Sequence, residues 1–197
     1  MKTNSKKFDQ IVDAAKSLFW KHGIKRVTVE EICDNAQVSK MTFYKHFSNK
    51  TELAKYILKN LFDEGIQIYR DIESSDIPYV DKVKKIIQMK MDMTNEISQE
   101  FLNDVYKGDD PELAKMVENY LQRNMKMIQD DLKKAQREGN IRKDMHPEFL
   151  IYILNRVIDM TTDENLNKLF NNPQEMIHEF VNFFYYGVMP YPQKNTK

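Results

Sequence analysis

Residues 40–46, KMTFYKH, place hydrogen-bond donors, cations and aromatic rings on one short segment. Side-chain donors are present at Lys40, Thr42, Tyr44, Lys45 and His46. Phe43 and Phe47 are four residues apart and form an apolar strip on the opposite side of a helix. Ammonium and hydroxyl groups bind phosphates and base edges, whereas Met41 can contact only a sugar or a thymine methyl group. The segment predicts a helix that lies in the major groove of DNA. The alternative is a solvated helix face without a ligand.

The residues before this segment predict the elements that position it. Thr28 and Glu31 have the spacing of a capping box, which marks the start of a helix. Val38 follows in a tight turn, and Ser39 is a suitable N-cap for the helix that carries the donors. Two short helices joined by a turn form a helix-turn-helix, whose second helix reads the major groove.

Charge is distributed unevenly along the 197 residues, although the formal net charge is zero. Residues 1–60 hold 12 Lys and Arg against 6 Asp and Glu, and the remainder holds 18 against 24. The N-terminal part therefore carries a net charge of +6 and the rest a net charge of −6. A basic domain attracts phosphate, and an acidic remainder confines that attraction to one end.

Residues 8–58 resemble the DNA-binding domain of the TetR family of bacterial transcriptional repressors. The elements TVEEI, AQVSKMTFYKHF and KTEL occur in the family's order, after an amphipathic helix that ends at Gly23. Two positions depart from the family pattern. Gln37 stands in the turn where glycine is usual and where a positive φ is expected, and Met41 stands where a small residue is common.

The resemblance implies two groups of DNA-binding residues. The implied phosphate contacts are Thr28, Thr42, Tyr44 and Lys50. The implied groove face consists of Lys40, Met41, Lys45 and His46, and His46 is expected to contact a phosphate. Because Met41 departs from the family pattern, no operator sequence follows from the resemblance.

The rest of the chain predicts an all-α fold, because sustained apolar alternation and hairpin turn signals are absent. We expect a three-helix DNA-binding head at residues 1–50, a helical effector-binding and dimerisation body at 51–190 and a short tail at 191–197. No apolar run is long enough to span a membrane, and the N-terminus lacks the apolar core of a secretory signal. The single cysteine suits a reducing compartment, so we expect a cytoplasmic protein without membrane contact.

The last two predicted helices, which begin near Pro147 and Pro173, are apolar over most of their circumference. Only one side of each helix can pack on the body of the same chain, so the other side requires a partner. The candidate interface residues are Phe149, Ile153, Val157, Ile177, Phe180, Val181 and Phe184. An isologous homodimer built as a four-helix bundle is the favoured interpretation, which agrees with the family resemblance; two central helices of a monomer are the alternative.

The body is rich in methionine, with 12 in the whole chain. Family members hold a small-molecule inducer in this region, and flexible thioethers suit a pocket for a largely apolar ligand. The candidate lining residues are Met89, Met93, Phe101, Tyr106, Met116, Tyr120 and Met127. The alternative is that these residues only fill the core. No buried charge is visible as an anchor, so an apolar or cationic aromatic effector is the expectation.

An enzyme is not expected, because the sequence has no glycine-rich phosphate loop, nucleophile elbow or Cys and His cluster. Glu175 and His178 have a metal-like spacing that occurs by chance on many helices. No cofactor, catalytic residue or metal is predicted.

The predicted function is a ligand-responsive regulator that binds a palindromic double-stranded DNA operator as a homodimer and represses transcription until a small effector releases it. A DNA-bound structural or partner-docking protein without an inducer is the alternative. The regulated genes, the effector's identity and the choice between repressor and activator remain open.

Overall fold

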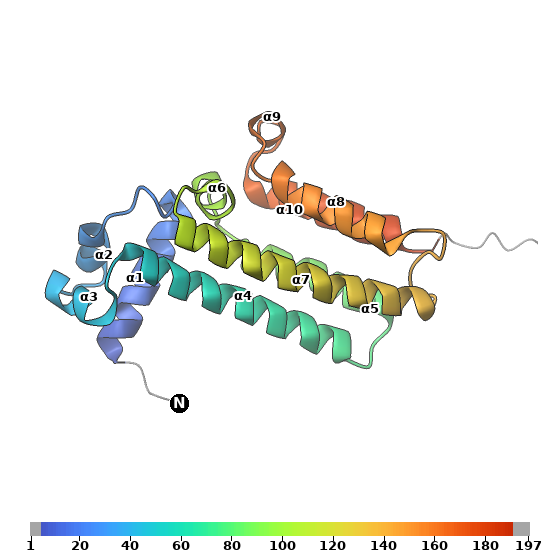
Figure 1. Ribbon diagram of the computed structural model, residues 1–197, viewed down its shortest axis with the longest axis horizontal. Helices are drawn as coiled ribbons and strands as arrows, with labels where there is room; N and C mark the ends of the chain where they lie inside the picture. Colours follow the sequence, from blue (N-terminus) through green and yellow to red (C-terminus); the bar gives the residue numbers. More distant parts are fainter. Residues whose placement is uncertain (1–4, 191–197) are drawn as a thin grey trace, which may run out of the picture. The chain divides into compact units, whose positions relative to one another are not determined.

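The computed structural model describes residues 5–190, except for the side chain of Ile158, and all regular structure in this part is helical. Ten helices occur in the described residues (Figure 1): α1 Lys6–His22, α2 Val29–Asn35, α3 Lys40–His46, α4 Lys50–Ser74, α5 Tyr79–Met93, α6 Gln99–Lys107, α7 Pro111–Arg137, α8 Pro147–Met160, α9 Glu164–Asn167 and α10 Pro173–Val188. The predicted all-α class is confirmed. The predicted tail, residues 191–197, lies outside the described residues. Within residues 5–190, no helix combines the length and hydropathy needed to cross a bilayer.

The helices form two compact units whose segments alternate along the chain. The first unit contains residues 5–67 and 95–118, and the second contains 68–94 and 119–190. Each of α4 and α7 therefore contributes residues to both units. The expected domain division at residue 50 follows the helix-turn-helix motif, whereas the contacts also group α6 with the N-terminal helices.

The first unit is built around α1, which contacts α2, α3 and α6. Local capping explains where α1 begins and ends. The Ser5 hydroxyl accepts a hydrogen bond from the backbone N–H of Phe8, and the N–H of Gly23 donates to the carbonyl of Phe19. The core side chains are almost fully buried: Ile11, Ala15, Phe19, Val27, Ile32, Phe43, Leu53 and Ala54. Because the buried residues of α1 to α3 recur at helical spacing, one core fixes all three helices.

Helix α6 approaches the end of α1 closely. The rings of Trp20 and Phe101 lie 4.3 Å apart between centroids, and the N–H of Ser98 donates to the Trp20 carbonyl at 2.9 Å. Gly23 has a φ of 80°, and a Cβ at this position would lie 2.6 Å from a carboxylate oxygen of Asp104. Glycine is therefore required at residue 23 both by its backbone conformation and by the packing of α6.

The second unit contains two apolar clusters. One consists of Leu132, Ala135, Ile141, Leu150, Phe184 and Val188. The other is formed by Tyr69, Ile86 and Met89, with Ile68, Ile72, Met93, Met127, Ile128 and Tyr185 packed against it. Helix α10 packs along α5, and the side-chain amide of Gln174 donates to the carbonyl of Thr94 at the end of α5.

The predicted helix starts near Pro147 and Pro173 are confirmed, because α8 begins at Pro147 and α10 at Pro173. Helix α7 also begins at a proline, Pro111. The one-turn helix α9 was not predicted. The Asp163 carboxylate caps it by accepting from the N–H groups of Asn165 and Leu166. So short a helix has no apolar periodicity and depends on this cap.

Candidate nucleic-acid interface

The helix-turn-helix of residues 28–46 has the predicted caps. The Thr28 hydroxyl accepts from the N–H of Glu31, and the Glu31 carboxylate accepts from the N–H of Thr28 at 2.8 Å. The backbone N–H and the hydroxyl of Thr28 both donate to the Glu31 carboxylate, and these two bonds lower the pKa of Glu31. At the next helix, the Ser39 hydroxyl accepts from the N–H of Thr42 at 3.1 Å. Both helix starts are therefore fixed by side chains a few residues away.

Gln37 has a φ of 53°, which confirms the positive φ expected in the turn. A non-glycine residue in this region carries a strain of about 1 kcal/mol. The turn is held by the N–H of Val38, which donates to the Cys33 carbonyl at 3.0 Å. The geometry of the turn thus persists without the usual glycine.

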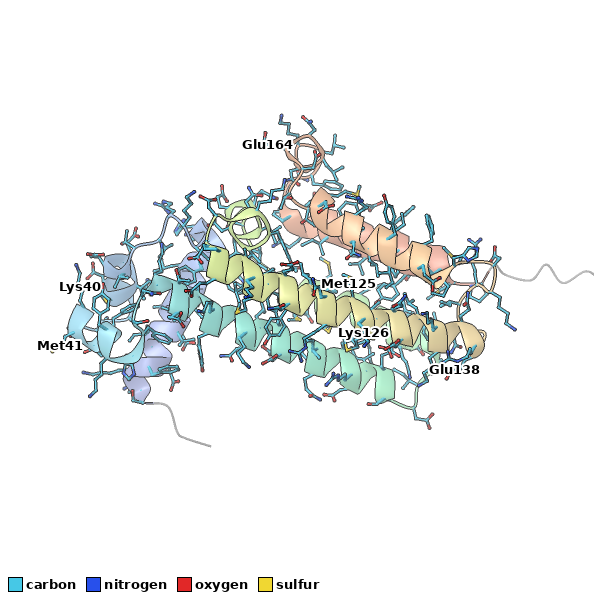
Figure 2. The ribbon with its side chains drawn as sticks, in the orientation of Figure 1. Lys40, Met41, Met125, Lys126, Glu138 and Glu164 are labelled. Carbon is cyan, nitrogen blue, oxygen red and sulfur yellow. The ribbon has the colours of Figure 1, made fainter. Side chains whose placement is uncertain are left out.

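Helix α3 has a buried side and an exposed side. Phe43 is fully buried and Phe47, its C-cap, is 7% exposed. Met41 is 84% exposed and Tyr44 is 55% exposed, with Lys45 exposed beside them. Figure 2 shows Lys40 and Met41 projecting outward from α3. Large apolar and aromatic side chains that remain exposed on a basic helix mark an interaction surface.

Lys40 is already paired in the free protein. Its ammonium group donates to the Glu30 carboxylate of α2, and this bond raises the pKa of Lys40 and lowers that of Glu30. Both side chains are more than half exposed, so solvent screens the pair and its contribution to stability is small.

Two predicted contact residues also act within the protein. His46 is half-buried, its Nε2 lies 3.5 Å from the Ser5 hydroxyl, and its ring meets Phe8 edge-on at 5.6 Å. Thr42 is half-buried, and its hydroxyl lies 3.0 Å from that of Ser39. Both side chains therefore position the start of α1 or α3 in addition to any role at DNA.

Lys50 directs its ammonium group inward. It donates to the carbonyl of Lys25 at 3.0 Å and to that of Val27, in the loop that leads into α2. Partial burial lowers the pKa of Lys50. Only one of its three N–H groups is left for a phosphate. Lys50 therefore fixes the approach to the first helix of the motif.

Lys25 is surrounded by acidic residues that lie about 80 positions away in the sequence. Its backbone N–H donates to Asp104, and its ammonium group lies 2.8 Å from an oxygen of Asp109. Nearby, the Thr51 hydroxyl donates to Asp110 at 2.7 Å. A cavity of about 260 Å³ lies among these side chains. Helix α6 supplies Asp104, the segment between α6 and α7 supplies Asp109 and Asp110, and only folding brings them to the basic loop.

Residues 11–57, which span this motif, match the family model described as bacterial regulatory proteins, tetR family. Residues 11–57 therefore form a domain of the TetR family. A segment of 67 residues is 37% identical to the HTH-type transcriptional regulator TtgR of Pseudomonas putida, and it covers 34% of this chain and 32% of TtgR. The match to TtgR thus spans about a third of that protein.

Two further proteins match over most of the chain. The HTH-type transcriptional repressor KstR2 of Mycobacterium tuberculosis is 23% identical over 148 residues, which are 73% of this chain and 72% of KstR2. The solved structure of the fatty acid degradation regulator FadR from Bacillus halodurans superposes with a TM-score of 0.70 at 17% identity, covering 93% of this chain and 96% of FadR. At this identity the likeness to FadR shows the fold alone.

The residues predicted for a TetR-type dimer interface lie on α8 and α10 of the second unit. Phe149 is 53% exposed. Ile153, Val157, Ile177, Phe180 and Val181 are half-buried. Phe184 is only 6% exposed, because it packs in the cluster with Leu132 and Leu150. The strongly exposed aromatic side chains that the prediction did not include are Tyr152, Phe183 and Tyr186.

The residues predicted for an effector pocket are divided between the two units. Phe101, Tyr106 and Met116 belong to the first unit, and Phe101 packs on Trp20. Met89, Met93, Tyr120 and Met127 belong to the second unit. Met89, Met93 and Met127 pack in the apolar cluster around Tyr69 and Ile86. This packing is also what is expected if these residues only fill the core.

The second unit contains a more polar cavity of about 310 Å³ near the ends of α4 and α7. Glu73 and Asp131 line it together with Tyr79, and desolvation raises the pKa of each of these three groups. None of the predicted pocket residues lines this cavity or the one near Lys25. Among residues 5–190, no group of three His, Cys, Asp or Glu side chains has the arrangement of a metal site.

Proposed function

We propose that this TetR-family protein is a DNA-binding transcriptional regulator, a repressor that occupies a palindromic operator as a homodimer. The observation that carries the proposal is the two-sided character of α3. Phe43 is fully buried in the first unit, whereas Met41, Tyr44 and Lys45 extend from the opposite side. A short, rigidly capped helix with exposed cations and a hydroxyl fits the major groove.

Each exposed residue of α3 has a distinct task at the operator. Lys40 leaves Glu30 to reach a guanine acceptor or a phosphate, and Lys45 offers a second ammonium group. The Tyr44 hydroxyl donates to a phosphate, while Met41 contacts a thymine methyl group or a sugar. Thr28 and Lys50 support the same phosphate strand from the start of α2 and α4.

The second copy of the chain is proposed to pack on the exposed aromatic side chains of α8 and α10. Phe183 is 75% exposed, and Phe149, Tyr152 and Tyr186 are each more than half exposed. Four such side chains on two neighbouring helices are more apolar surface than a monomer usually leaves in water. A two-fold dimer would separate its recognition helices by one DNA turn, about 34–36 Å, and would require a palindrome.

A small, largely apolar effector is proposed to release the operator. The methionine-rich second unit supports an adaptable apolar site. KstR2 is named a ketosteroid transcriptional regulator and FadR a fatty acid degradation regulator, and both names refer to compounds with a large apolar part. Release requires that the effector bind the two states of the dimer with different affinities, since equal affinities shift no equilibrium.

The test is selection of bound sequences from a random duplex pool at about 150 mM salt, which suppresses non-specific phosphate binding. We expect a palindrome whose half-sites are about 10 base pairs apart. The matched variant Tyr44→Phe, Lys45→Ala should enrich no motif under the same conditions. Recovery of an unpaired half-site would contradict the dimer, and recovery of no motif from the unaltered protein would favour a partner-docking protein.

A further inference from the structure

The cavity of about 310 Å³ lies within the second unit, and part of its wall is apolar. Tyr79 and Ala135 line it; Ala135 belongs to the apolar cluster around Leu132, and Tyr79 packs against that cluster. Ile77 and Pro78, from the turn between α4 and α5, extend this wall. The volume is that of a small-molecule pocket. The apolar core of the unit therefore borders a space that a small molecule can fill.

Most of the remaining lining is ionisable. Four carboxylates and two ammonium groups border the cavity, those of Glu73, Asp76, Asp131, Glu138, Lys82 and Lys134. The carboxylates outnumber the ammonium groups by two, so the lining carries a net negative charge at neutral pH. The ammonium group of Lys82 donates to the backbone carbonyl of Glu73 rather than to a carboxylate. Within residues 5–190, none of the four carboxylates forms an ion pair.

Glu73 and Asp131 border the cavity from two different helices, α4 and α7, and both side chains are half-buried. Desolvation and the charge of Asp131 raise the pKa of Glu73, and Lys82 and Lys134 oppose this shift. The hydroxyl of Tyr69, a residue that is 8% exposed, hydrogen-bonds to the Asp131 carboxylate. Two carboxylates that border one space repel each other, and a cation bound between them removes this repulsion.

We propose that this cavity binds a protonated primary amine that carries a small apolar or aromatic group. Its ammonium group would donate to the carboxylates of Glu73 and Asp131 in charge-assisted hydrogen bonds. Its apolar group would pack on Ile77, Tyr79 and Ala135, where it is removed from water. An amine suits the lining better than a metal ion does, because no three His, Cys, Asp or Glu side chains of the described residues are arranged to hold a metal.

Amine binding goes beyond the proposed function and does not depend on it. All residues that line the cavity belong to the second unit, whereas the helix-turn-helix belongs to the first. DNA is absent from the titrations described below, so failure of operator binding and failure of amine binding are separate results.

The test uses two fluorescent probes with one naphthalene skeleton. The amine 2-(1-naphthyl)ethylamine is protonated at neutral pH, and the alcohol 2-(1-naphthyl)ethanol is its uncharged counterpart. Titration of the full chain should show tighter binding of the amine. Glu73→Gln and Asp131→Asn should each weaken amine binding roughly tenfold, the usual size of one charge-assisted contact, and leave alcohol binding within about twofold.

Asp130→Asn is the matched control, because Asp130 is an exposed neighbour of Asp131 that does not line the cavity. It removes the same charge and should bind both probes as the unaltered protein does. Ile77→Ala shortens the apolar wall and should weaken both probes by a similar factor. Unchanged amine affinity in folded Glu73→Gln and Asp131→Asn would overturn the proposal, as would equal affinity of the unaltered protein for the two probes.

Discussion

Two regions of the molecule differ in how far their side chains find partners within the same chain. One region is the helix-turn-helix of the first unit, and the other is the second unit. In the first, the Thr28, Glu31 and Ser39 side chains cap helices within three residues, and Phe43 is fully buried. In the second, Phe183 is 75% exposed, and the carboxylates of Glu73 and Asp131 form no ion pair among the described residues.

The difference indicates what each region requires from outside. The helix-turn-helix buries Phe43 and Phe47 within its own unit and leaves Met41 and Tyr44 exposed on the opposite side of α3. The second unit retains apolar surface and two half-buried carboxylates without an ion pair, both of which destabilise an isolated chain. A second copy of the chain packed on α8 and α10 would remove the first of these costs.

The exposed aromatic surface of α8 and α10 should be the most sensitive. Phe183→Glu would place one carboxylate per copy in an apolar interface, and we expect the dimer dissociation constant to rise roughly 100-fold or more. Sedimentation velocity measures the change. Leu169→Glu is the control, since Leu169 is 76% exposed in the turn after α9. A dimer of unchanged stability in Phe183→Glu would place the interface elsewhere.

The exposed side of α3 should show the next largest effect. Tyr44→Phe combined with Lys45→Ala should weaken operator binding by about 2–4 kcal/mol, and the salt dependence should fall by about one unit of slope for the lost lysine. Gel-shift titrations at several salt concentrations measure both quantities. Lys85→Ala, in the second unit, should change neither. Unchanged affinity in the double variant would remove α3 from the DNA interface.

Removing one carboxylate of the polar cavity should stabilise the free protein. Desolvation and Asp131 raise the pKa of Glu73 above its ordinary value of 4.5, so the charge of Glu73 costs stability at neutral pH and the cost is absent below about pH 4.5. Glu73→Gln should therefore raise the free energy of unfolding by about 1–2 kcal/mol at neutral pH and change it little in acid. Urea denaturation at both pH values measures the change. The control Asp130→Asn should remain within about 0.5 kcal/mol of the unaltered protein. A destabilised Glu73→Gln at neutral pH would show that the Glu73 carboxylate has a structural partner.

The strained turn offers a smaller effect inside the first unit. Gln37→Gly should stabilise the protein by up to about 1 kcal/mol, because glycine tolerates the φ of 53° without strain. Gln37→Ala keeps the Cβ and should give no such gain. The difference in stability between the two variants therefore measures the free-energy cost of the positive φ. Equal stabilities of the two variants would show that the turn carries no strain.

The smallest effect should come from the capping box at low pH. The pKa of Glu31 is lowered from an ordinary value of 4.5 by its hydrogen bonds to Thr28. Its contribution is therefore present above about pH 4.5 and is lost as the pH falls through the lowered pKa. Glu31→Gln should be less stable than the unaltered protein at neutral pH and equal to it in strong acid. Urea denaturation across this range measures the difference.

The local geometry of the helix-turn-helix could be predicted because its determinants lie close together in the sequence. Thr28 and Glu31 form the predicted capping box, Ser39 caps the next helix, and Gln37 adopts the predicted positive φ. The prolines that begin α7, α8 and α10 act in the same local way. A cap or a turn involves residues at most a few positions apart, so the sequence reports it directly.

The positions of the Lys50 and Phe184 side chains could not be predicted, because they depend on contacts with residues far away in the sequence. Lys50 binds the carbonyl of Lys25, 25 residues away, and Phe184 packs with Leu132 and Leu150. Apolar periodicity places Phe184 on an apolar helix but does not say which of its sides meets the same chain.

The sequence by itself determined the all-α class, the helix-turn-helix with its caps and the basic charge of the N-terminal part, because each depends on residue types at short spacing. Only the folded structure shows that Asp104 and Asp109 bind Lys25 and that Phe183 rather than Phe184 remains exposed. Burial and pairing depend on which distant helices meet, and that is settled only when the chain has folded.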